Sequence, residues 1–151
     1  HTTGWKIGYC CAPAALTTEI RKVHQFMVFT VPSPFQHALA TYTSDAATYQ
    51  NLPAFYQQKR DYLTKGLQQT RFKVLPSPGT FFLLANYDQI AEQNEADFSI
   101  WLTKNHKVTA IPVSAFYAQP DALASNHKLV RFCFAKEATT LDLAIERLMQ
   151  I

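Results

Sequence analysis

The chain has 151 residues, of which 48% are hydrophobic and 17% are charged. This composition excludes an intrinsically disordered protein, because 11 Phe and 7 Tyr can build a hydrophobic core. The net charge is +3, and the basic residues are scattered along the chain, so a nucleic-acid-binding protein is not expected. No apolar run approaches the roughly 20 residues that a membrane span needs.

The three cysteines are Cys10, Cys11 and Cys133. An odd number with two adjacent members does not indicate a disulfide framework. No C-x-x-C pair or paired-histidine spacing accompanies them, so zinc is not expected either. We therefore predict that they are buried, reduced side chains in a cytoplasmic protein.

The first half of the chain predicts one strand followed by helices. Residues 4–12 read as the strand. Apolar side chains then recur at helical spacing in 16–27 and again in 35–46, with the sequence VPSP (31–34) between them. A third helix is predicted from Pro53 to about residue 70, which makes it the longest in the chain.

From about residue 70 the pattern becomes that of a self-consistent α+β unit. Strands are predicted at 71–75, 80–87, 107–113 and 127–134, and the first two are joined by the turn sequence PSPG (76–79). Asn94 is predicted to cap a helix, and a Thr139-x-x-Asp142 capping box is predicted to begin the last one. The strand at 4–12 lies outside this unit and has no obvious partner for its backbone hydrogen bonds.

Lys6 is the first charged residue that interrupts an apolar strand pattern. On the predicted strand it shares its face with Gly4 and Gly8. Small neighbours leave room for an anionic group to approach the lysine closely. The alternative is a solvated lysine on an exposed strand face, and spacing alone favours this alternative.

Arg131 is the second such residue, within the apolar sequence KLVRFCF (128–134). A guanidinium drawn into that setting needs a partner, because leaving a buried charge unpaired costs about 3–5 kcal/mol. Its planar fork matches a carboxylate with two parallel hydrogen bonds, so an external carboxylate is one interpretation. An internal ion pair with Asp88 or Glu137 is the other, and the sequence pattern leaves both open.

Four separated motifs resemble one known family in the correct order: TGWKIGYCCAP (3–13), EIRKVHQFMVF (19–29), IPVSAFY (111–117) and HKLVRFCFAKEATTL (127–141). They resemble the C-terminal part of class I (fold type I) pyridoxal-phosphate-dependent aminotransferases. Within these, the chain is most similar to the methionine aminotransferase and kynurenine or glutamine aminotransferase group. The resemblance covers essentially the whole chain.

This resemblance implies an α/β and α+β fold: the tail of a fold type I large domain, followed by the small C-terminal α+β domain. Residues 1–45 would belong to the large pyridoxal-phosphate-binding domain, 46–70 would form the connecting helix, and 71–151 would form the small domain. The family works as a homodimer and uses pyridoxal 5'-phosphate as its cofactor.

The resemblance also implies roles for three side chains. Lys6 would contact the cofactor phosphate, and Arg131 would bind the α-carboxylate of the substrate. Phe29, together with the adjacent Thr30, would line the side-chain pocket of the neighbouring subunit. The family's Schiff-base lysine lies in an S-x-G-K-T-type motif just before the sequence HTTGW, so no catalytic residue is expected in these 151 residues.

The expected activity is that of an aminotransferase fragment that is inactive alone. The full-length enzyme would transfer an amino group from methionine, or another bulky or aromatic amino acid, to a 2-oxo acid. One alternative is a cysteine-conjugate β-lyase of the same fold. Another is a stand-alone α+β ligand-binding module, which would need no upstream lysine.

Overall fold

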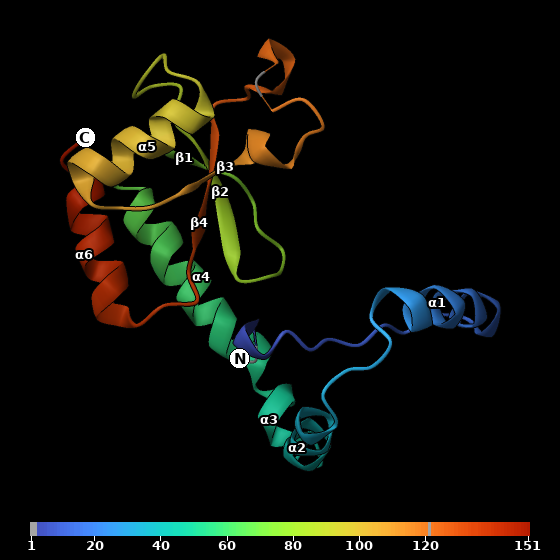
Figure 1. Ribbon diagram of the computed structural model, residues 1–151. Helices are drawn as coiled ribbons and strands as arrows, with labels where there is room; N and C mark the ends of the chain where they lie inside the picture. Colours follow the sequence, from blue (N-terminus) through green and yellow to red (C-terminus); the bar gives the residue numbers. More distant parts are fainter. Residues whose placement is uncertain (1–2, 121) are drawn as a thin grey trace. The chain divides into compact units, whose positions relative to one another are not determined.

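A computed structural model describes residues 3–120 and 122–151 (Figure 1). The chain divides into two compact units, His1–Asn51 and Leu52–Ile151. We describe each unit by itself. The predicted domain boundaries at 45 and 70 stay a prediction.

The first unit is helical. Its elements are the short 3-10 helix η1 (Thr3–Trp5) and the α-helices α1 (Ala14–Met27), α2 (Ser33–Thr43) and α3 (Ala47–Gln50). Helices α1 and α2 confirm the two predicted from apolar spacing, and the Pro-containing segment separates them as expected. No side chain in the described part of this unit is buried.

The predicted strand at 4–12 is wrong. Residues Thr3–Trp5 form a turn of 3-10 helix, and residues 7–13 have no regular structure. A strand needs a neighbour for its backbone donors and acceptors, and residues 3–51 contain no other strand. The segment instead makes a local side-chain contact, since the ring of Trp5 stacks on Phe35 with centroids 4.7 Å apart.

The second unit is an antiparallel sheet with three helices. The strands are β1 (Lys73–Val74), β2 (Phe82–Asn86), β3 (Ile111–Pro112) and β4 (Leu129–Cys133), in the order β1-β2-β4-β3. The helices are α4 (Leu52–Leu67), α5 (Glu95–His106) and α6 (Ala138–Leu148), with the 3-10 helices η2 (Val113–Phe116) and η3 (Leu123–Ser125) between β3 and β4. Figure 1 shows α4 and α6 side by side in this unit. Helix α4 is the longest in the described chain, as predicted.

Alternation along β2 and β4 decides which side chains enter the core. Leu83 pairs with Phe132 and Ala85 pairs with Val130, and all four side chains are buried. The three helices contribute to the same core through their apolar faces: Leu63, Leu67, Phe98, Leu102, Leu141 and Leu148. The intervening residues of each strand therefore point to the opposite face of the sheet.

Two details of this unit differ from the sequence predictions. Strand β3 is only Ile111–Pro112, because Lys107 ends α5 in the left-handed conformation and Pro112 cannot donate a backbone hydrogen bond. The capping box is also wrong, since α6 begins at Ala138 with Glu137 as N-cap and no side-chain cap. The Asn94 cap is confirmed, because its side chain accepts a 2.9 Å hydrogen bond from the backbone N–H of Asp97.

The expected burial of the cysteines is wrong as well. Cys10, Cys11 and Cys133 are all exposed and free. The first two lie in the segment that does not form a strand, and Cys133 lies at the exposed end of β4. Within the described residues, no helix has the length and hydropathy needed to cross a membrane.

Candidate functional site

Arg131 lies in the middle of β4 on the face of the sheet opposite the core. Leu84 of β2 stands beside it on one side and Ile111 of β3 on the other. The arginine is half-buried. An inner strand thus holds its backbone from both sides, which fixes where the side chain starts.

The guanidinium of Arg131 lies between two aromatic rings. Its central carbon is 4.4 Å from the ring centroid of Phe82 and 4.9 Å from that of Phe116. Each ring attracts the cation through its π face, and this interaction uses none of the guanidinium N–H donors. The rings therefore hold the guanidinium in place and leave its donors for other partners.

No acidic side chain pairs with Arg131 in residues 3–120 and 122–151. The expected candidates Asp88 and Glu137 make no ion pair with it, and no described residue forms a hydrogen bond with its guanidinium. The internal ion-pair interpretation is therefore not realised in this part of the chain. A half-buried guanidinium with free donors can bind an external carboxylate bidentately.

Phe116 was not predicted as part of a site. The sequence pattern places the FY pair at 116–117 more naturally in a core, yet Phe116 is 63% exposed and Tyr117 is also exposed. The reason is that η2 follows the short strand β3 and carries Phe116 over the open face of the sheet. Apolar character alone cannot distinguish a core ring from a ring that covers an arginine.

Glu95 is a second residue that the sequence analysis missed. It is only 1% exposed, and its carboxylate accepts hydrogen bonds from three backbone N–H groups. These belong to Ser114 in η2 and to His127 and Leu129 at the start of β4. Its neighbour Asn94 is a recognisable cap, whereas nothing in the local pattern marks Glu95.

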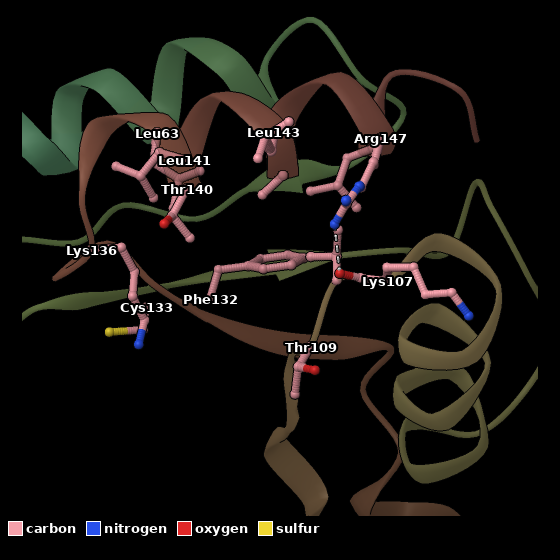
Figure 2. Close-up of a pocket in the computed structure, with 13 residues that line it drawn as sticks. Leu63, Lys107, Thr109, Phe132, Cys133, Lys136, Thr140, Leu141, Leu143 and Arg147 are labelled. Carbon is pink, nitrogen blue, oxygen red and sulfur yellow. Dashed lines mark hydrogen bonds between the residues drawn. The ribbon is translucent and has the colours of Figure 1, made fainter.

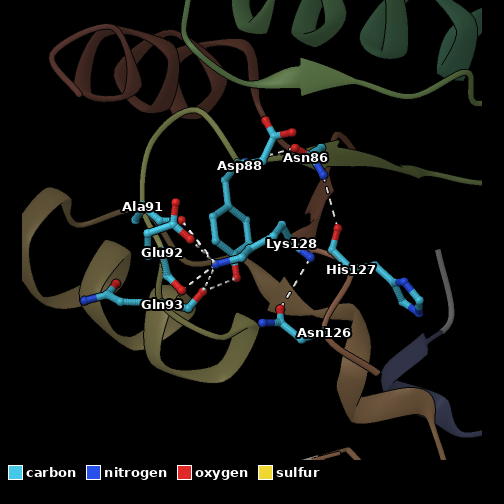
Figure 3. Close-up of polar contacts among 9 residues, drawn as sticks. Asn86, Asp88, Ala91, Glu92, Gln93, Asn126, His127 and Lys128 are labelled. Atoms are coloured by element: carbon cyan, nitrogen blue, oxygen red, sulfur yellow. Dashed lines mark hydrogen bonds and ion pairs between the residues drawn. The ribbon is translucent and has the colours of Figure 1, made fainter. Parts of the chain in front are cut away.

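Lys128 holds the same region from the other direction (Figure 3). Its ammonium donates to the backbone carbonyls of Ala91, Glu92 and Gln93, and it also lies 3.5 Å from the Glu92 carboxylate. The Tyr87 hydroxyl donates to the same Gln93 carbonyl at 3.0 Å. Burial, followed by the charge of Glu95, raises the pKa of Tyr87 far above its usual range, so this phenol stays a neutral donor.

Lys6 belongs to the first unit and is exposed. Its backbone is left-handed, with φ 54°, and its ammonium has no hydrogen-bond or ion-pair partner among the described residues. Because residues 4–12 form no strand, Gly4 and Gly8 do not share a strand face with Lys6. The exposed ammonium itself is available to an anionic group such as a phosphate.

Phe29 also belongs to the first unit and is 82% exposed. It has φ 66°, and its N–H bonds the carbonyl of His24, so it ends α1 in the position that glycine usually takes. A left-handed backbone costs a non-glycine residue about 1–2 kcal/mol. An exposed aromatic ring held at this cost is a candidate for contact with another molecule.

Lys6 and Phe29 lie in one unit and Arg131 in the other, so each is described within its own unit. Within residues 3–120 and 122–151, no group of His, Cys, Asp and Glu could hold a metal ion. The second unit by itself thus presents a half-buried guanidinium between Phe82 and Phe116, and the first presents an exposed lysine.

A cavity of about 290 Å³ lies elsewhere in the second unit (Figure 2). It lies between α6, the segment after α5 and the core side of β4, where Phe132 lines it. Arg147 crosses one side of it and donates to the Lys107 carbonyl at 3.1 Å. Because Phe132 and Arg131 point to opposite faces of the sheet, this cavity is not part of the Arg131 site.

Comparison with known proteins identifies the class. Residues 2–148 match the family described as aminotransferase class I and II. The chain belongs to this family.

Its relatives include specific enzymes. The chain is 48% identical to a methionine aminotransferase from Escherichia coli (strain K12), covering 100% of this chain and 38% of that protein. It is 38% identical to a probable N-succinyldiaminopimelate aminotransferase from Mycobacterium tuberculosis, covering 98% of this chain and 39% of that protein. The chain thus spans less than two fifths of the length of these relatives.

The fold comparison agrees. The crystal structure of YbdL from Escherichia coli, for which a methionine aminotransferase function was identified, matches with a TM-score of 0.88 at 48% identity. The match covers 100% of this chain and 39% of that one. The predicted family resemblance and the predicted fold class are thereby confirmed.

Proposed function

We propose that this chain forms the substrate-carboxylate-binding, C-terminal part of a pyridoxal-phosphate-dependent aminotransferase. The full-length enzyme moves an amino group from methionine, or another bulky uncharged or aromatic amino acid, to a 2-oxo acid. The observation that carries the proposal is Arg131, whose guanidinium is stacked between Phe82 and Phe116 with no internal acid paired to it in the described chain.

Arg131 binds the α-carboxylate in this proposal. Two parallel N–H···O bonds set the direction of the substrate as well as its position, which a lysine ammonium cannot do. The exposed ring of Phe116 beside the fork gives the substrate an apolar surface at the same site. An apolar neighbour favours an uncharged side chain, in line with the similarity to a methionine aminotransferase.

Lys6 would hold the phosphate of pyridoxal 5'-phosphate. Its exposed ammonium, which has no hydrogen-bond or ion-pair partner among the described residues, supports this role. When bound, the cofactor supplies the electron sink for the reaction. The family resemblance places the cofactor-bearing lysine ahead of residue 1, so we expect these 151 residues alone to have no transaminase activity.

Phe29 would line the side-chain pocket of the neighbouring subunit in a cytoplasmic homodimer. The support is its exposed ring on a left-handed backbone at the end of α1. Exposure of an apolar ring to water is unfavourable, whereas a subunit interface would bury the ring and so lower the free energy. This part of the proposal concerns the assembled enzyme.

The test replaces each charge in the full-length enzyme. Arg131→Lys should lower kcat/KM for methionine about 100-fold, since a charge-assisted contact contributes about 1.5–3 kcal/mol, and should leave the cofactor absorbance spectrum intact. Lys6→Ala should do the reverse, weakening the affinity for pyridoxal phosphate while substrate binding by the saturated enzyme changes less. An unchanged kcat/KM in Arg131→Lys would show that the carboxylate lies elsewhere.

A further inference from the structure

We infer that Glu95 is a positioning residue for the Arg131 site: it holds together the two backbone segments that carry Arg131 and Phe116. This inference rests on the proposed function, because it assumes that Arg131 binds the substrate carboxylate. It adds a residue whose hydrogen bonds in the described chain go to backbone N–H groups and not to the guanidinium. Its effect on the substrate is transmitted through the backbone.

The two oxygens of Glu95 divide between the two segments. Oε2 accepts from the N–H of Ser114, two residues before Phe116. Oε1 accepts from His127 at 3.0 Å and from Leu129 at 2.9 Å, and Leu129 lies two residues before Arg131. One rigid carboxylate thereby sets the spacing between η2 and β4, and the stacking of Phe116 on Arg131 depends on that spacing.

The sheet alone does not hold η2 in place. Strand β3 pairs with β4 only through Ile111 and Pro112, so its ladder ends immediately before η2 begins. Phe116 itself is exposed and is not fixed by core packing. Ser114 itself is buried, and the bond from its N–H to Glu95 is the hydrogen bond that links this helical turn to α5.

Lys128 provides a matched contrast. It also joins the start of β4 to the region around α5, through the carbonyls of residues 91–93. None of these contacts reaches η2. Losing the Lys128 ammonium removes a comparable set of charge-assisted hydrogen bonds but leaves the spacing between η2 and β4 under the control of Glu95.

A purely structural role for Glu95 gives a different expectation. A carboxylate in the first turn of α5 interacts favourably with the helix dipole, and it satisfies buried donors that would otherwise be unpaired. If this were its whole contribution, replacing it would lower stability without moving the guanidinium of Arg131. The two roles are distinguished by measuring ligand binding and stability in the same variants.

The experiment uses the full-length enzyme and four variants: Glu95→Gln, Glu95→Asp, Lys128→Met and Arg131→Lys. Glutamine keeps the shape but offers an N–H₂ group where one oxygen accepted, so at least one backbone N–H loses its acceptor. Aspartate keeps the charge but is one methylene too short to reach both segments. It serves as the second variant if glutamine at this position prevents folding.

Binding is measured by calorimetry with 4-(methylthio)butanoate, which carries the carboxylate and apolar chain of methionine without its amino group. We expect about a tenfold higher Kd in both Glu95 variants, which corresponds to a loss of about 1.4 kcal/mol in binding free energy. Lys128→Met should change Kd less than twofold even though its Tm falls. The NMR signal of the Arg131 Nε–H group should shift in the Glu95 variants and stay in place in Lys128→Met.

The remaining outcomes separate the two proposals. If Arg131→Lys leaves the Kd unchanged, the proposed carboxylate site is wrong, and the role of Glu95 at it falls too. If Arg131→Lys abolishes binding while the Glu95 variants lose stability only, as Lys128→Met does, the proposed function stands and Glu95 is structural. Equal Kd values for both Glu95 variants and the parent enzyme overturn the inference.

Discussion

Helix α1 in the first unit and helix α6 in the second carry the same kind of amphipathic pattern, yet only one of them is packed. Leu141 and Leu148 of α6 are buried against the sheet and α4. Leu16 and Val23 of α1 are exposed. No described side chain of the first unit is buried. An apolar stripe predicts a helix, but whether the stripe is covered depends on what the rest of the fold places against it.

The two units differ in whether helices have a sheet to pack on. In the second unit, an inner pair of strands offers an apolar face, and side chains from three helices pack in the same core. In the first unit, the described residues form helices and irregular segments but no strand, so this unit offers no sheet for their apolar side chains to pack on. Burial of apolar area is the dominant favourable term in folding, so the second unit should carry almost all the stability of the 151-residue chain.

The largest expected effect is a core truncation. Phe98 is fully buried and stacks on Tyr87 with ring centroids 3.8 Å apart. Phe98→Ala should lower the free energy of unfolding by about 3–5 kcal/mol, because a large cavity replaces the ring. Urea denaturation of the 151-residue chain, followed by far-UV circular dichroism, measures the loss.

The matched control lies in the first unit. Phe26 is 86% exposed at the end of α1. Phe26→Ala should change the free energy of unfolding by about 0.5 kcal/mol or less, as exposed substitutions do. A loss comparable to that of Phe98→Ala would mean that α1 is packed against another surface in solution, and the contrast between the units would fail.

A smaller effect is expected where α4 and α6 meet. Gly66 of α4 is buried, and a Cβ added there would lie 2.5 Å from Cγ1 and 3.0 Å from Cγ2 of Ile145. Gly66→Ala gains about 1 kcal/mol in helix propensity but should lose about 1–3 kcal/mol to overpacking, because a β-branched isoleucine moves little. We expect a net destabilisation of about 1 kcal/mol by the same denaturation measurement.

Gly8→Ala tests the same substitution in the first unit. Nothing lies within 4 Å of a Cβ added at Gly8, so we expect no steric cost and a change of about 0.5 kcal/mol or less. If Gly66→Ala proved stabilising, the packing of α4 on α6 would be looser than the structure shows.

An effect of similar size is expected at the helix caps. Asn94→Ala removes the side chain that accepts from the Asp97 N–H at the start of α5, and should cost about 1 kcal/mol. Thr139→Ala is the control, because Thr139 lies inside α6 and makes no capping bond. Its effect should be about 0.5 kcal/mol or less, and alanine can even stabilise a helix at that position. Thermal unfolding followed by circular dichroism measures the stability of both variants. An equal loss of stability in Thr139→Ala would show that Thr139 caps α6 after all.

Local spacing in the sequence determined most of the helices and one hairpin. The apolar repeats of α1, α2 and α4 were readable because neighbours three and four residues apart share a helix face. The turn sequence at 76–79 marked the β1–β2 hairpin, and Asn94 marked the start of α5. The family was readable for the same reason, since its motifs are short runs of consecutive residues.

The tertiary structure alone decided the outcome at 4–12 and the surroundings of Arg131. An isolated run of strand-forming residues becomes a strand only when a partner supplies hydrogen bonds, and residues 3–51 supply none. Glu95 contacts residues 19 to 34 positions away, and Phe116 reaches Arg131 across the open face of the sheet. Contacts at such separations leave no periodicity in the sequence. For Arg131, the residue type and its apolar strand were therefore readable from the sequence, whereas its free donors were set by the way the chain folds around it.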